Sequence, residues 1–226
     1  MPKSAPTAIP SQCSILIVDD HPMFREYLTQ LINRELGLNV CGEADNVRDA
    51  MRLIQEHRPD VAIVDITLRG PSGLELLKDI KAQGIKISVL VLSMHEEELY
   101  AERAMRAGAR GYITKNEVST TVVKAIRKVV AGEIYASKRF TNTLLERIVQ
   151  TRSAPDASEI ASLADRELEV LQLLGRGKNT KEIAQALGLG ESTVETYRSR
   201  IREKLGLNSS AALYLRAAQW VRDNVT

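Results

Sequence analysis

The segment Val61–Asp65 has the sequence VAIVD, a buried-type apolar run that ends on a carboxylate. Similar runs are ILIV at Ile15–Val18 and ISVLVL at Ile87–Leu92, with weaker ones at Leu38–Cys41 and Gly111–Thr114. Consecutive apolar positions without alternation are typical of strands covered on both faces, as in a parallel sheet. The sequence therefore predicts five buried strands.

Windows with helical periodicity separate these runs, near residues 22–36, 47–57, 73–83, 97–107 and 118–131. Strands that alternate with helices form a parallel sheet with right-handed crossovers. We therefore expect an α/β doubly wound domain with a five-stranded parallel sheet at residues 14–134. A disordered leader at residues 1–13 is expected before it.

The remainder of the chain contains no strand pattern. Residues 135–161 are expected to form a linker with a polar hinge and a short helix near residues 144–149. Residues 162–226 are expected to form an all-α domain of four helices, near 165–175, 179–187, 192–205 and 209–222. Gly188 and Gly190 mark one turn, Gly206 a helix end, and Ser192 the expected cap of the third helix.

The third of these helices combines an apolar stripe with a charged face. Val194, Tyr197, Ile201 and Leu205 recur at three- and four-residue steps, which predicts their burial. Four cations fall between residues 198 and 204 on the remaining faces. A short helix, a glycine turn and a basic helix predict a helix-turn-helix that binds double-stranded DNA. A solvated helix face would explain the charges but not the turn.

Polar residues follow the predicted strands at their carboxyl ends, where ligands bind in open parallel sheets. These residues are Asp19, Asp20, Asp65, Ser93 and Lys115. Neighbouring carboxylates repel one another unless a cation neutralises them, and Mg²⁺ prefers such oxygen ligands. A carboxylate also attacks phosphorus, and an ammonium group and a hydroxyl then stabilise the phosphoryl oxygens. Each aspartate alone would be explained as a turn residue.

The composition bounds the class of protein. The chain has 226 residues, a net charge of +2 and 44% hydrophobic residues, as in an ordinary soluble protein. Cys13 and Cys41 follow no metal-ligand or redox spacing, so a cytoplasmic location is expected. No stretch approaches the roughly 18 apolar residues that span a bilayer, so no membrane partner is expected.

The segments ILIVDDHPMFRE, AIVDITLRGPSGLELL, VLVLSMHEEE and RAGARGYITKNE resemble a response-regulator receiver domain with a flavodoxin-like fold. The resemblance implies that Asp65 accepts a phosphoryl group from a sensor histidine kinase and that Lys115 contacts this group. It matches Ser93 and Tyr112 to the family's switch pair, although Tyr112 is equally well explained as a half-buried strand residue. The implied ligands of Mg²⁺ are Asp19, Asp20, Asp65 and the backbone carbonyl of Thr67.

The segment DRELEVLQLLGRGKNTKEIAQALGLGESTVETYRSRIREKLGL resembles a LuxR-type output domain, so the whole chain is similar to the NarL/FixJ family of two-component response regulators. The resemblance implies a bacterial transcription regulator whose phosphorylation controls homodimerisation and DNA binding. Glu195, Thr196 and Ser199 would face base edges; Glu195 would accept from a cytosine amino group or bridge to Arg198 or Ser199. Candidates for backbone phosphates are Arg198, Arg200, Arg202, Lys178, Asn179, Thr180 and Lys181.

Two positions depart from these families. Arg69 stands four residues after Asp65, where receivers commonly carry proline, so a reshaped loop is expected. Ala164 stands where a capping Ser or Thr usually precedes Glu167, which should cost about 1 kcal/mol locally. His95, near the predicted site, is interpreted as a surface loop residue.

Two other classes of function stay open. A ligand-sensing or phosphorylation-independent LuxR-type regulator would bind DNA but would not need three carboxylates and a lysine. A phosphatase-type enzyme would turn over at Asp65, but such enzymes tend to carry a second carboxylate where this chain has Thr67. We therefore expect no enzyme activity beyond slow autodephosphorylation.

Overall fold

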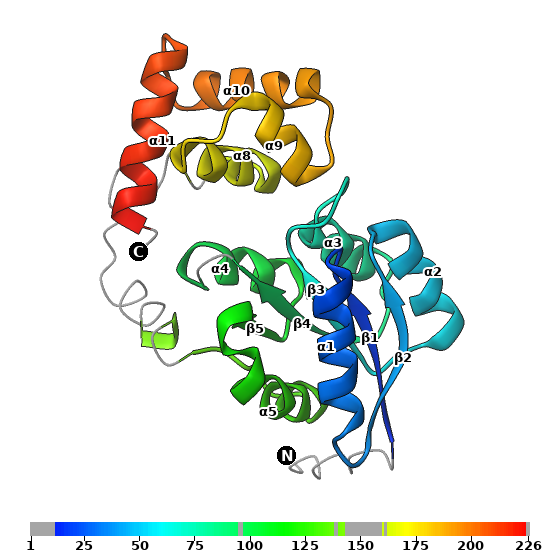
Figure 1. Ribbon diagram of the computed structural model, residues 1–226. Coiled ribbons are helices and arrows are strands. Elements are labelled where there is room, and N and C mark those ends of the chain that lie inside the picture. The colour runs from blue at the N-terminus through cyan, green and yellow to red at the C-terminus, as the bar shows by residue number, and fades with distance from the viewer. Residues whose placement is uncertain (1–11, 95–96, 138–139, 143–159, 161, 225–226) are drawn as a thin grey trace. The chain divides into compact units, whose positions relative to one another are not determined.

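The computed structural model describes residues 12–94, 97–137, 140–142, 160 and 162–224 (Figure 1). The chain divides into two compact units, Met1–Thr141 and Asn142–Thr226. The strands of the first unit are β1 (Cys13–Val18), β2 (Leu38–Ala44), β3 (Val61–Asp65), β4 (Ser88–Ser93) and β5 (Gly111–Thr114). Its helices are α1 (Pro22–Asn33), α2 (Val47–His57), α3 (Gly73–Ala82), α4 (Glu97–Ala107), the 3₁₀ helix η1 (Lys115–Glu117) and α5 (Val118–Val130).

The five strands form one parallel sheet in the order β2-β1-β3-β4-β5. The predicted doubly wound five-stranded sheet is therefore confirmed. The chain runs outward from β1 to β2 and returns to β3 on the other side of β1, so the winding direction reverses between β1 and β3. Ligands bind at the carboxyl ends of the strands where such a reversal occurs. Here Asp19 follows β1, and Asp65 is the last residue of β3.

Helices cover both faces of the sheet (Figure 1). Every residue of β3 is buried, as its unbroken apolar sequence predicts, whereas the edge strand β2 is partly exposed. Helices α1 and α5 pack on one face around a core that includes Leu28, Ile63 and Ile126. Helices α2, α3 and α4 lie side by side on the other face, with α3 in the middle.

The boundaries of the first unit differ from those expected. Cys13, assigned to the leader, is the first residue of β1; it is fully buried and its N–H donates to Gly37 O at 2.8 Å. Tyr135, assigned to the linker, pairs with the edge of the sheet, because Tyr112 N donates to Tyr135 O at 3.0 Å. A short extended segment can pair with the edge of a sheet through backbone hydrogen bonds alone. Such pairing requires no pattern of apolar residues, so the sequence does not reveal it. The helix expected near residues 144–149 lies outside the described residues.

The described part of the second unit is all-α, as predicted. Its helices are α8 (Asp165–Gly175), α9 (Thr180–Leu187), α10 (Glu191–Lys204) and α11 (Ser210–Asn224). Gly188 and Gly206 both have φ of 63° and end α9 and α10, as expected from the tolerance of glycine for left-handed backbone. The expected cap at Ser192 is wrong: Gly190 is the N-cap, and Ser192 lies inside the first turn of α10.

No helix within the described ranges combines the length and the apolar character that crossing a bilayer requires.

Candidate functional site

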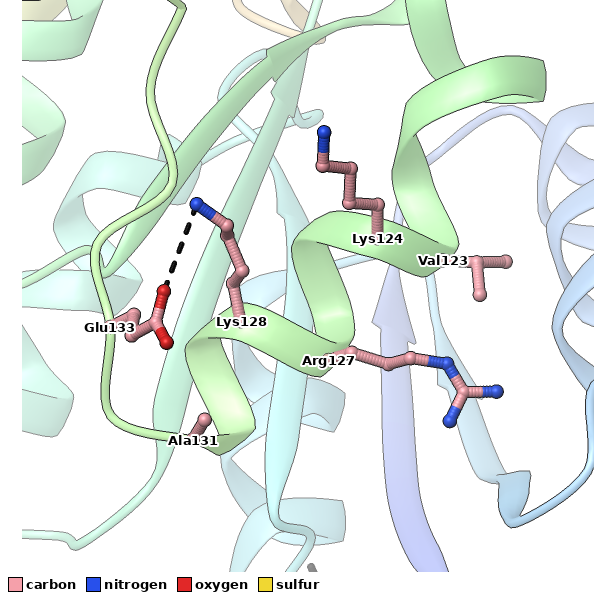
Figure 2. Close-up of a pocket in the computed structure, with 6 residues that line it drawn as sticks. All are labelled: Val123, Lys124, Arg127, Lys128, Ala131 and Glu133. Atoms are coloured by element: carbon pink, nitrogen blue, oxygen red, sulfur yellow. Dashed lines mark ion pairs between the residues drawn. The ribbon is translucent and has the colours of Figure 1, made fainter. Parts of the chain in front are cut away.

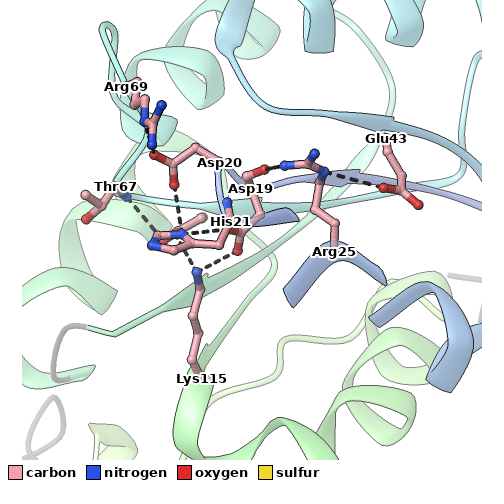
Figure 3. A network of polar contacts seen from close by, with 9 residues as sticks. Asp19, Asp20, His21, Arg25, Glu43, Thr67, Arg69 and Lys115 are labelled. Atoms are coloured by element: carbon pink, nitrogen blue, oxygen red, sulfur yellow. Dashed lines mark hydrogen bonds and ion pairs between the residues drawn. The ribbon is translucent and has the colours of Figure 1, made fainter. Parts of the chain in front are cut away.

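Lys115 bridges two buried carboxylates at the carboxyl edge of the sheet (Figure 3). Asp19 follows β1 and Asp65 ends β3, and the side chain of each is 2% exposed. Lys115 follows β5, and its Nζ lies 2.6 Å from Oδ2 of both aspartates. The same ammonium group lies 4.5 Å from the ring centroid of Phe24 on α1. The structure thus brings together three side chains that are far apart in the sequence.

Burial and the neighbouring charges shift the pKa values of Asp65 and Lys115 in this cluster. Burial raises the pKa of Asp65 to about 7, because it disfavours the charged form; Lys115 opposes this shift and the charge of Asp19 adds to it. The N–H of Thr67 donates to Asp65 Oδ1 at 3.2 Å and also favours the charged form. Burial lowers the pKa of Lys115, but the two carboxylates outweigh burial and hold this pKa above its usual value. A further cation would therefore be attracted to the site.

Asp20 lies on the more open side of the cluster. Its Oδ1 is 2.8 Å from His21 Nδ1, but no hydrogen bond satisfies this buried oxygen in the described part of the chain. Its Oδ2 lies 3.4 Å from Nε of Arg69, whose side chain is 74% exposed (Figure 3). The residue that replaces the usual proline in this loop is therefore an ion-pair partner of a predicted metal ligand.

The acidic side chains are close enough to share a cation. Ligand atoms of Asp19, Asp20, His21 and Asp65 all lie within 4.8 Å of one another. Three carboxylates are the hard oxygen donors that suit Mg²⁺, and the unsatisfied Asp20 Oδ1 fits a divalent ion. His21 was not among the predicted ligands; its position directly after two aspartates at a strand end was the available signal.

Gly73 allows α3 to begin against the backbone of Asp65. A Cβ at this position would lie 1.9 Å from the carbonyl oxygen of Asp65, a distance that no side chain tolerates. The N–H of Gly73 donates to Ile66 O at 2.8 Å, and Ser72 and Glu75 form a capping box at the start of α3. The loop after Asp65 is therefore held at both ends.

The predicted switch pair lies on the two strands beyond β3. Asp65 pairs with Leu92, so Ser93 is one position further along β4, and its side chain is fully buried. Tyr112 pairs with Val91 and is 1% exposed, so it is more deeply buried than expected. His95 lies outside the described residues.

A separate shallow pocket of about 520 Å³ lies along α5 and the residues that follow it (Figure 2). Its lining residues are Val123, Lys124, Arg127, Lys128, Ala131 and Glu133. Lys128 lies 3.7 Å from Glu133, and Arg127 lies 3.4 Å from Glu35. Because no strand-end residue lines it, this pocket is not part of the acidic cluster.

Most predicted DNA contacts in the second unit are accessible. The exposed ones are Lys178, Asn179, Lys181, Glu195, Thr196, Ser199 and Arg200, whereas Thr180 and Arg202 are partly buried. Asn179 caps α9, since its side chain accepts from Glu182 N at 3.0 Å, and Lys178 lies 3.3 Å from Glu182. Two of the predicted phosphate contacts thus also stabilise the start of α9.

Arg198 differs from the others because its side chain is only 11% exposed. The expectation that it lies outside is wrong. Its Nη1 donates to Thr180 Oγ1 at 2.7 Å and to Glu195 Oε1 at 2.5 Å, and its guanidinium carbon lies 5.2 Å from the ring centroid of Tyr214 on α11. A long side chain reaches partners on neighbouring turns and helices that periodicity alone does not reveal.

Comparison with known proteins agrees with this architecture. Residues 15–127 match the response regulator receiver domain, and residues 161–217 match the luxR family of bacterial regulatory proteins. The chain is 39% identical over 193 residues to the transcriptional regulatory protein DesR of Bacillus subtilis, covering 85% of this chain and 89% of DesR. It is 35% identical over 205 residues to the response regulator GacA of Pseudomonas aeruginosa, covering 91% and 95%.

Solved structures agree as well. A two-component response regulator of the LuxR family from Aurantimonas sp. is 36% identical with a TM-score of 0.58, covering 62% of this chain and 99% of that one. A structure of two RcsB dimers bound to two parallel DNAs is 25% identical with a TM-score of 0.55, covering 91% and 98%.

The fold and the two matched regions define the first unit as a receiver domain and the second as a LuxR-type DNA-binding domain. The chain belongs to the NarL/FixJ-type two-component response regulators, which regulate transcription.

Proposed function

We propose that Asp65 accepts a phosphoryl group from a sensor histidine kinase and that this modification controls homodimerisation and DNA binding. The observation that carries the proposal is the position of Asp65: it is buried at a strand end, 2.6 Å from Lys115 and beside the carboxylates of Asp19 and Asp20. This arrangement combines a nucleophilic carboxylate with a fixed cation for the incoming phosphoryl oxygens.

The transfer step follows from this arrangement. A carboxylate oxygen of Asp65 attacks the phosphorus of a phosphorylated imidazole, so a P–O bond forms as the P–N bond breaks. The imidazole leaves as a neutral ring when its other nitrogen carries a proton. Lys115 already lies at hydrogen-bond distance from Asp65 Oδ2, and its ammonium group stabilises charge on the phosphoryl oxygens.

The residues around Asp65 fit a magnesium ion. Asp19, Asp20, Asp65 and the backbone carbonyl of Thr67 would hold it, and Asp20 Oδ1 is the buried oxygen that still needs a partner. When bound, Mg²⁺ supplies positive charge that offsets the carboxylates and the transferred phosphoryl group.

The receiver is proposed to be a substrate of phosphoryl transfer rather than an enzyme. A hydrolytic enzyme would need a base to activate water against the acyl phosphate, and the residue two positions after Asp65 is Thr67. We therefore expect no turnover beyond slow autodephosphorylation.

Two observations support the proposal that the protein binds DNA as a dimer: the low net charge of its C-terminal unit and its similarity to RcsB. The RcsB relative binds DNA as dimers. From residue 158 to residue 226 this chain has ten Lys/Arg against nine Asp/Glu, so one copy offers only a local basic patch. Two copies on paired half-sites double the number of phosphate contacts and therefore raise the affinity.

The test compares Asp65→Asn with Asp79→Asn, a matched change at an exposed carboxylate on α3. Each full-length protein is treated with phosphoramidate and magnesium, and intact mass and DNA affinity are measured on a duplex selected with the wild-type protein. Wild type and Asp79→Asn should gain one phosphoryl group and bind more tightly, while Asp65→Asn should do neither. A gain of affinity in Asp65→Asn would refute the proposal, and phosphorylation without any change in affinity would favour a phosphorylation-independent regulator.

A further inference from the structure

We propose that Arg198 is a positioning residue for base recognition and not a phosphate contact. It holds Glu195 in one orientation and offsets its negative charge, so that Glu195 can read a cytosine in the major groove. The proposal rests on DNA binding by the LuxR-type unit and does not depend on phosphorylation of Asp65.

The first observation is a closed ring of hydrogen bonds between α9 and α10. Arg198 Nη1 donates to Thr180 Oγ1 at 2.7 Å and to Glu195 Oε1 at 2.5 Å. The hydroxyl of Thr180 donates in turn to the same Glu195 oxygen at 2.7 Å. Because each of the three residues contacts the other two, the Glu195 side chain is held from two directions.

The second observation is the environment of the guanidinium group. Arg198 is 11% exposed and lies against the Tyr214 ring, so its position is fixed by α11 as well as by α9. Arg200, two residues further on the same helix, is exposed and forms no ion pair with any described residue. Only the second of these arginines is free to follow a DNA phosphate.

The third observation concerns the other oxygen of Glu195. The side chain is 55% exposed, and Oε2 accepts no hydrogen bond from the described residues, while Oε1 accepts two. A fixed carboxylate oxygen is an acceptor for the amino group of cytosine, the base that offers a donor in the major groove without an adjacent acceptor. An acceptor held at this place therefore favours cytosine over the other bases.

Charge explains why the arginine is needed. An uncompensated carboxylate on a recognition helix is repelled by the phosphates that flank the groove. The Arg198–Glu195 pair has no net charge, so the helix keeps an acceptor for one base without losing attraction to DNA. Removing Arg198 should therefore be costly only while Glu195 is charged.

A double-mutant cycle tests this dependence. Full-length wild type, Arg198→Met, Glu195→Gln and the double variant are titrated against a labelled duplex recovered from a random pool with the wild-type protein. We expect Arg198→Met to weaken binding about tenfold with Glu195 present and less than about twofold in the Glu195→Gln background. Equal losses in both backgrounds would show an independent phosphate contact and would overturn the proposal.

Salt dependence and base preference supply two further readouts. Arg200→Met is the matched control, and it should lower the slope of log affinity against log salt by about one. Selection with Glu195→Gln or with Arg198→Met should lose the preference for cytosine at the same position. Retention of that preference in Arg198→Met, together with a slope change like that of Arg200→Met, contradicts the positioning role.

Folding is monitored through Trp220, the single tryptophan of the chain, which is buried in α11. If Arg198→Met does not fold, Arg198→Lys takes its place, since lysine keeps the charge but cannot donate to Thr180 and Glu195 from one planar group. It should keep the salt slope and weaken the cytosine preference, and an unchanged preference would count against the proposal. If the wild-type protein selects no duplex at all, DNA binding itself has failed.

Discussion

At the scale of single residues, the acidic site has more negative than positive charge. Asp19 and Asp65 are buried, and both pair with the ammonium group of Lys115. Asp20 pairs with the exposed side chain of Arg69. This excess of negative charge favours the binding of a divalent ion. Without a cation, the repulsion between the carboxylates should lower the free energy of unfolding of the receiver.

Removal of the Asp65 charge should stabilise the cation-free protein. The pKa of Asp65 is raised from 3.8 to about 7 by burial, so the unfolded state loses its proton first and stability falls as pH rises between these values. At about pH 8 in a chelator, Asp65→Asn should raise the free energy of unfolding by roughly 1–3 kcal/mol, measured by urea unfolding. The gain should shrink toward about pH 4, and a loss at high pH would mean that the Asp65–Lys115 pair is net stabilising.

Arg69 should compete with a divalent ion for Asp20. Its Nε lies 3.4 Å from Asp20 Oδ2 on an exposed side chain, so the ion pair is weak. Arg69→Ala should bind Mg²⁺ roughly two- to fivefold more tightly in calorimetric titrations. Arg106→Ala is the matched control, since Arg106 is 79% exposed and pairs with Glu102 on α4. Equal affinities in wild type and Arg69→Ala would show that Asp20 is not held by Arg69.

At the scale of elements, α8 begins with half of a capping box. Glu167 Oε2 accepts from Ala164 N at 2.8 Å and lies 2.7 Å from Lys204 Nζ on α10. The methyl group of Ala164 cannot accept the hydrogen bond from Glu167 N that a hydroxyl would accept. The hydrogen bond from Ala164 N to Glu167 is therefore in place, and the motif lacks only a side-chain oxygen at position 164.

Ala164→Ser should complete this motif and stabilise the C-terminal unit by about 0.5–1 kcal/mol. The melting temperature is read from the fluorescence of Trp220, which lies in this unit. Ala164→Val is the control, because valine adds bulk without an acceptor. A serine variant that melts no higher than the valine variant would contradict the capping argument.

The strands were predictable from unbroken apolar runs, and the helices from the helical period of their apolar residues. The VAIVD segment is buried, and the predicted polar residues lie at the carboxyl ends of β1, β3, β4 and β5. Tyr135 on the sheet edge was not predictable, because its pairing with the sheet consists of backbone hydrogen bonds, which leave no hydrophobic pattern in the sequence. Arg198 was misplaced because it falls outside the apolar stripe of the helix, whereas its long side chain reaches Thr180 on α9.

At the scale of the whole molecule, phosphorylation is expected to change the assembly state. Treatment with beryllofluoride and magnesium should shift the mass in light scattering from the monomer value of 25.1 kDa to twice that value. Asp65→Asn should remain monomeric under the same conditions, because it lacks the carboxylate that we propose as the phosphoryl acceptor. If the untreated protein were already fully dimeric, dimerisation would not depend on phosphorylation.

The order of the strands also bears on how the protein is made. Lys115 is translated 50 residues after Asp65, and it meets the aspartate only once β4 and β5 have joined the sheet. A ribosome-bound chain that stops before Lys115 lacks the cation of the site, however well its earlier strands have paired. The complete arrangement of Asp19, Asp65 and Lys115 should therefore form late in synthesis.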